Sequence, residues 1–128
     1  MKTTFSMWVA GTPRPQPRPR FVKGRVISTV DAGTKAWQHA IRSMAYMMRG
    51  EPITGAVRCR LRFDMPIKDA KRHGQPHTGR PDVDNLAKLV MDQLTAAGIW
   101  GDDAKVASLE CHKVYAAKGG VGVEIESI

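Results

Sequence analysis

Apolar and polar residues alternate in four stretches of the chain, which is the pattern of a β-strand with one face buried. The clearest stretch is 56–66, AVRCRLRFDMP, where the odd positions from 57 to 65 are apolar and the even positions carry three arginines and an aspartate. A shorter pattern over 21–28 predicts a hairpin with its turn at Lys23-Gly24. The other three long strand patterns cover 3–9, 105–115 and 121–127.

Two further stretches repeat apolar residues with the 3.6-residue period of an amphipathic helix. The first covers 34–49 and stops before Gly50. The second covers 84–97, and either Asp84 or Asn85 can serve near its N-cap. The resulting order is β, hairpin, α, β, loop, α, β, β. This order predicts an α+β fold in which two helices pack on a mixed or antiparallel sheet.

The chain has 128 residues, which is enough for one core, so we expect a single domain over 1–128. Two segments have no regular pattern: a Pro/Arg-rich arm at 11–20 and a basic, flexible loop at 67–81. No run of about 18 apolar residues occurs, and the N-terminal stretch lacks the apolar core of a signal peptide. We therefore expect a cytoplasmic protein without a membrane segment, in which Cys59 and Cys111 stay reduced.

Charge is divided unevenly along the chain. Residues 1–81 hold 16 Lys+Arg and 4 Asp+Glu, whereas residues 82–128 hold 4 and 8. A surface as basic as the first part attracts polyanions such as DNA. The side chains that we expect to contact phosphates lie in the arm and the loop, and they are Arg14, Arg18, Arg20, Lys71, Arg72 and Arg80.

Other interpretations of these basic segments stay open. The arm at 11–20 could be a proline-rich ligand for a partner's aromatic groove, or a plain loop. The three arginines of 56–66 share one strand face, where they could follow a phosphate backbone or simply meet solvent.

Acidic residues gather in the second part of this basic protein. In PDVDN, Asp82 and Asp84 would point to the same side if the segment were extended. Asp84, Lys88 and Asp92 are spaced i, i+4, i+8 and share one helix face. After the helix, a return connection could bring Asp103 back toward the first two acids. Three carboxylates beside a lysine are what Mg²⁺-dependent phosphodiester hydrolysis requires.

Simpler roles for the same residues are an N-cap for Asp84, an ion pair for Lys88 and a polar turn for Asp102-Asp103. The spacing from Pro81-Asp82 to Asp103-Ala104-Lys105 also fits the permissive PD…(D/E)xK pattern of many nucleases. That pattern would make Lys105, rather than Lys88, the catalytic lysine.

The stretch 80–106, RPDVDNLAKLVMDQLTAAGIWGDDAKV, resembles the signature of the RusA family of Holliday-junction resolvases, which are common in bacteria and their prophages. The resemblance lies in the D-x-D-N-L-x-K core, the helix with its internal Asp92 and the G-[IF]-W-x-D-D ending. It implies a homodimeric endonuclease that binds four-way DNA junctions and makes paired nicks. It further implies Mg²⁺, with Mn²⁺ as a substitute, held by Asp82, Asp84 and Asp103, with Lys88 as the essential lysine.

Two function classes other than a resolvase are also consistent with the sequence. One is a protein that binds junctions or single-stranded DNA without cutting, through its arginines and stacking aromatics. The other is a metal-dependent nuclease that uses the same acids on flaps or replication forks.

Overall fold

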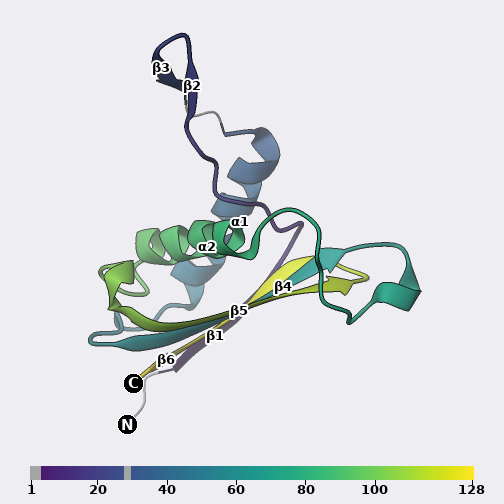
Figure 1. Ribbon diagram of the computed structural model, residues 1–128. Coiled ribbons are helices and arrows are strands. Elements are labelled where there is room, and N and C mark those ends of the chain that lie inside the picture. Colours follow the sequence, from purple (N-terminus) through teal and green to yellow (C-terminus); the bar gives the residue numbers. More distant parts are fainter. Residues whose placement is uncertain (1–3, 28–29) are drawn as a thin grey trace.

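The computed structural model describes residues 4–27 and 30–128 (Figure 1). The predicted order of strands and helices is confirmed within a few residues at each end. Thr3 and Ser28, which we had included in two strand patterns, lie outside the described part. The elements are β1 (Thr4–Ala10), β2 (Arg20–Val22), β3 (Arg25–Ile27), α1 (Ala32–Met48), β4 (Val57–Pro66), the 3₁₀ turn η1 (Ala70–Arg72), α2 (Val83–Ala97), the 3₁₀ turn η2 (Asp103–Lys105), β5 (Val106–Ala116) and β6 (Gly120–Ser127).

Four strands form one mixed sheet in the order β1-β6-β4-β5, and β2 and β3 form a separate two-stranded sheet. The pairs β1–β6 and β4–β6 are antiparallel, whereas β4 and β5 are parallel. The parallel pair requires a crossover, and α2 lies in it. Both α1 and α2 cover the same face of the sheet (Figure 1). The predicted α+β architecture is therefore confirmed.

The core lies between the two helices and the covered face of the sheet. The odd residues of β4 point into it, as the alternation predicts, and Val57, Cys59 and Phe63 are fully buried. Cys59 and Cys111 are free thiols, as expected, and burial raises their pKa values to about 12 and about 11. No helix in the described part of the chain is long and apolar enough to cross a membrane.

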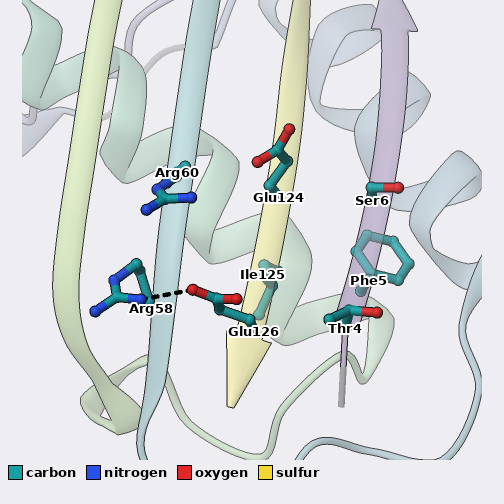
Figure 2. Close-up of a pocket in the computed structure, with 8 residues that line it drawn as sticks. All are labelled: Thr4, Phe5, Ser6, Arg58, Arg60, Glu124, Ile125 and Glu126. Atoms are coloured by element: carbon teal, nitrogen blue, oxygen red, sulfur yellow. Dashed lines mark hydrogen bonds and ion pairs between the residues drawn. The ribbon is translucent and has the colours of Figure 1, made fainter. Parts of the chain in front are cut away.

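The opposite face of the sheet carries the three arginines of β4, and each has an acidic partner. Arg58 lies 2.6 Å from Glu126 and Arg60 lies 3.2 Å from Glu110. Arg62 lies 2.9 Å from Asp64 on the same strand. Figure 2 shows Arg58 and Arg60 beside the glutamates of β6, on the side away from the helices. Because the arginine charge is compensated by neighbouring carboxylates, the structure favours a solvent-facing sheet surface over a track for phosphates.

The start of α2 corrects one prediction. The helix begins at Val83, so Asp82 occupies the N-cap position that we had given to Asp84 or Asn85. Pro81 directly precedes this N-cap residue, and a proline disfavours helical backbone angles at the residue before it, which is Arg80. Asp84 instead lies in the first turn of the helix.

Candidate metal centre

Two carboxylates lie at the N-terminal end of α2, on the solvent-exposed surface. Asp82 has extended backbone angles (φ −71°, ψ 144°), and its side chain makes no capping hydrogen bond. Asp84 follows in the first helical turn. The N-terminus of a helix carries a partial positive charge that stabilises carboxylates. Asp82 is therefore not engaged in a capping hydrogen bond, and both carboxylates are accessible to a cation from solution.

Asp82 and Asp84 lie near each other because both belong to the start of α2, and not because they share one side of an extended segment. An extended segment would have placed them on one side, but this expectation is wrong because the backbone is already helical at Val83. The side chains consequently diverge around the helix by roughly 100° per residue. They still belong to the same helix end.

Lys88 lies one turn further along α2 and is surrounded by acids. Its Nζ donates to Asp92 Oδ1 at 2.7 Å, and the lysine side chain remains 55% exposed. The hydrogen bond to Asp92 raises the pKa of Lys88, and the negative charges of Asp92 and Asp103 raise it further, against a smaller opposing effect of burial. Asp103 therefore lies near enough to be felt by this ammonium group, which agrees with the predicted return of the chain after the helix.

The adjacent residues Asp102 and Asp103 have different roles. Asp102 Oδ1 accepts a hydrogen bond from the backbone N–H of Ala104 at 2.9 Å and caps η2. Asp103 is the first residue of that turn and is half-buried. The polar-turn interpretation thus accounts for Asp102 but not for Asp103, whose charge contributes to the raised pKa of Lys88. Lys105 is exposed at the end of η2, whereas Lys88 lies on the same helix as Asp84 and is also affected by the charge of Asp103, which favours Lys88 as the lysine of the site.

The complete set of three acids is not drawn together in this conformation. Among residues 4–27 and 30–128, no three His, Cys, Asp or Glu side chains lie close enough to share one metal ion. The donors are nevertheless of the right kind for Mg²⁺, which takes oxygen ligands and usually keeps several waters beside one or two carboxylates and the substrate phosphates. Asp82 and Asp84 are two exposed donors of this kind at one helix end, and Asp103 is a third acid, within electrostatic reach of Lys88.

The Pro/Arg-rich arm is tied to the same helix end. Arg18 donates from Nε and Nη2 to Asn85 Oδ1 at 3.2 and 2.7 Å, and its Nη2 lies 4.0 Å from Asp84 Oδ2. The backbone N–H of Gln16 also donates to the Asn85 carbonyl at 3.0 Å. The arm is therefore more than a plain loop: it holds a guanidinium group beside the acids. Asn85 as its anchor was missed from the sequence, since its partners lie 67 residues away.

Other predicted DNA contacts border a cavity beside this arm. Arg14 and Arg80, which come from different segments, both line it together with His77. Burial lowers the pKa of His77, and the charges of Lys113 and Arg72 lower it further. The imidazole consequently stays neutral near pH 7, and the two arginines supply the positive charge of the cavity.

The loop 67–81 is irregular, as expected, but much of it is bound to β5. Gly74 and His77 donate backbone hydrogen bonds to the carbonyls of Tyr115 and Lys113 at 2.8 and 3.0 Å. Arg72 donates to the Tyr115 hydroxyl at 2.6 Å and lies over its ring. Lys71 is an exposed member of η1. The side chain of Arg20 lies outside the described part of the structure.

Lys113 positions the segment that leads into Asp82, a role that was not predicted. Its Nζ donates to the carbonyls of Gly79 and Pro81, both at 2.8 Å. Its place on β5 was predicted, but its acceptors lie 34 and 32 residues earlier in the chain.

We expect Lys113→Met to destabilise the protein by about 2 kcal/mol, because two carbonyls lose a charged donor. Urea unfolding would measure this change. Lys118→Met, which alters an exposed residue of the β5–β6 turn, is the matched control and should change stability by less than about 0.5 kcal/mol. Equal stability of the two variants would show that the lysine does not hold the segment.

The chain is similar to a known protein family and to several curated proteins. The chain matches the family model described as "Endodeoxyribonuclease RusA" over residues 10–126. It is 38% identical over 66 residues to the "Crossover junction endodeoxyribonuclease rusA" of Lactococcus phage r1t, which covers 52% of this chain and 50% of that protein. It is 43% identical over 56 residues to the "Crossover junction endodeoxyribonuclease RusA" of Escherichia coli strain K12, covering 44% and 47%. A relative from Enterobacteria phage 82 matches to the same extent. The chain thus spans about half the length of the curated relatives it matches.

Proposed function

Because this chain belongs to the RusA family of endodeoxyribonucleases, we propose that it is a divalent-metal-dependent nuclease that resolves four-way DNA junctions by paired nicks. The observation that carries the proposal is the exposed pair Asp82 and Asp84 at the start of α2, with Lys88 and Asp103 beside it. The names of the relatives refer to crossover junctions, and two of the relatives come from phages. We place the protein's action on recombining DNA inside a bacterial cell.

The proposed ligands for Mg²⁺, or for Mn²⁺ in its place, are Asp82, Asp84 and Asp103. When bound, such a metal would activate a water nucleophile and neutralise charge on the phosphate. Lys88 stays protonated throughout the neutral pH range, since its neighbours raise its pKa. More than half of its side chain is exposed, so the ammonium group can reach a phosphate oxygen and stabilise charge that develops there.

DNA binding is assigned to the basic side chains around this site. Arg18 lies beside Asp84, and Arg14 and Arg80 line one cavity. Together with Arg20, Lys71 and Arg72 they would contact phosphates, which predicts binding that weakens steeply as salt rises. Partial compensation of Arg18 by Asp84 would be relieved when a metal takes over the carboxylate.

We further propose a homodimer. One chain offers one set of acids, whereas symmetric resolution requires a cut on each of two strands. A two-fold axis would present two such sites to a junction of matching symmetry.

A labelled synthetic four-way junction tests the proposal when it is incubated with the protein in Mg²⁺ and in EDTA, beside a linear duplex and a flap. We expect paired nicks near the branch point, only with Mg²⁺ and only on the junction. Cutting of the flap in preference to the junction would instead identify a nuclease of flaps or forks.

A binding protein without catalysis is the second candidate. It is favoured by the separation of the three acids in the described part of the chain. Tight junction binding with no cut in Mg²⁺ or Mn²⁺ would establish it and would overturn the nuclease.

A further inference from the structure

The β2–β3 hairpin projects away from the sheet and the helices (Figure 1). It pairs only with itself, as a two-stranded sheet, and does not join the four-stranded sheet. Its turn is well specified, because Lys23 and Gly24 both have positive φ angles of 50° and 75°. Such consecutive left-handed residues match the twist of a tight two-residue hairpin. The projection is therefore a defined element of structure.

The hairpin carries exposed apolar side chains. Within the described part of the chain, none of its residues belongs to the hydrophobic core. Phe21 is 77% exposed and Val26 is 63% exposed. The two residues are directly opposite in the antiparallel register, so their side chains share one face. An isolated two-stranded hairpin is marginally stable in water. A phenyl ring paired with a valine at its exposed face indicates a surface that is completed by a partner.

The position of the hairpin relative to the acids follows from the arm. Arg18 is held by Asn85 at the N-terminus of α2, and Phe21 follows three residues later. Three extended residues span at most about 11 Å, so the Phe21 backbone lies within that distance of the Arg18 backbone. The hairpin therefore begins directly after the part of the arm that is anchored on the acid-bearing end of α2.

The charge of this region selects the class of partner. Residues 1–30 contain no Asp or Glu, and their basic residues are Lys2, Arg14, Arg18, Arg20, Lys23 and Arg25. The segment is thus uniformly basic over the hairpin and the arm that precedes it. DNA would be attracted to it.

We propose that the β2–β3 hairpin recognises the branch point of the DNA, with the Phe21 ring stacked on a base that the junction leaves without a neighbour. The inference rests on the proposed function and deepens it, since it assigns the recognition of branched over linear DNA. Aromatic rings stack on bases of any sequence. Unstacking a base is least costly where the stack is already interrupted, so the ring gains more at a branch point than within a duplex.

The experiment measures binding of the full chain to DNA in EDTA, where no cutting occurs. A four-way junction would carry 2-aminopurine at the branch point or within an arm, and a linear duplex would serve as reference. We expect wild-type protein to change the fluorescence at the branch point and to leave the arm probe unchanged. Phe21→Ala should raise the junction dissociation constant about tenfold, abolish the branch-point signal and leave duplex affinity within twofold.

Matched variants separate stacking from folding of the hairpin. Phe21→Trp keeps a stacking ring and should restore both the affinity and the signal, whereas Phe21→Leu keeps only apolar bulk and should behave as Phe21→Ala does. Tyr46→Ala, which removes an exposed aromatic ring from α1 instead of the hairpin, should bind the junction within twofold of wild type.

Two results would overturn the inference. One is an unchanged junction-to-duplex preference in Phe21→Ala, with the branch-point signal intact. The other is a dimeric wild type that becomes monomeric in Phe21→Ala by sedimentation, which would assign the hairpin to a subunit contact. Failure of the proposed function is distinguished by the wild-type protein itself, which would then neither bind nor cut the junction in preference to duplex.

Discussion

Replacing Asp82 with Asn is expected to reduce junction cleavage in Mg²⁺ by at least about a thousandfold, equivalent to about 4 kcal/mol of lost transition-state stabilisation. The substitution keeps the size of the side chain and removes a charged oxygen ligand. Asp82 makes no capping hydrogen bond in α2, so the fold should not depend on its charge. Single-turnover cleavage rates and thermal unfolding would measure the two effects separately.

Junction binding in EDTA should persist in Asp82→Asn or become a few-fold tighter, because a negative charge near the phosphates is removed. Glu51→Gln is the matched control. It removes one exposed charge near Ile53, whose backbone N–H donates to Ile99 beyond the C-terminal end of α2. The 15 residues of α2 separate this position from Asp82 by about 22 Å. Cleavage by Asp82→Asn at the rate of Glu51→Gln would refute the metal site.

Substitutions of the adjacent residues Asp102 and Asp103 are expected to have very different effects on cleavage. Asp103→Asn should lower cleavage by about a hundredfold or more and raise the Mg²⁺ concentration needed for half-maximal rate, since a proposed ligand beside Lys88 is lost. Asp102→Asn should stay within about twofold of wild type. Asparagine retains an oxygen that can accept from Ala104 N–H and cap η2.

Both substitutions remove one negative charge at neighbouring positions, so general electrostatics cannot explain a difference between them. Equal losses in the two variants would indicate that only the local charge matters. Wild-type rates in both would exclude Asp103 from the metal site. Rates measured over a Mg²⁺ series would tell these cases apart.

Local periodicity accounts for most of what the sequence could predict. The strand β4 and the helix α2 were recognisable because burial imposes periods of 2 and 3.6 on their apolar residues. The acids around α2 and the pairing of Lys88 with Asp92 followed from helical spacing. The exact start of α2 could not be predicted, because the sequence PDVDN is compatible with either an extended or a helical backbone at Val83.

Contacts between distant segments could not be predicted. The sequence alone allowed Arg58 and Arg60 to follow a phosphate backbone. In the fold, their side chains pair with glutamates of β6 and β5 instead. In the same way, the anchoring of Arg18 on Asn85 and of the Pro81 carbonyl on Lys113 depends on chain segments that meet only in the fold. Family resemblance supplied the choice of Lys88 over Lys105, and the electrostatic effect of Asp103 on the pKa of Lys88 is consistent with it.

The place of β6 in the sheet has a consequence for folding of the protein. This last strand lies between β1 and β4, and Thr4 pairs with Glu126 near the other end of the chain. The elements β4, α2 and β5 follow one another in the sequence and can assemble early, but β1 has no partner in the four-stranded sheet until β6 docks. Such end-to-end pairing slows folding, since a long loop must close first. A folding intermediate in which β6 has not yet docked would therefore expose the unpaired edges of β1 and β4 and tend to aggregate.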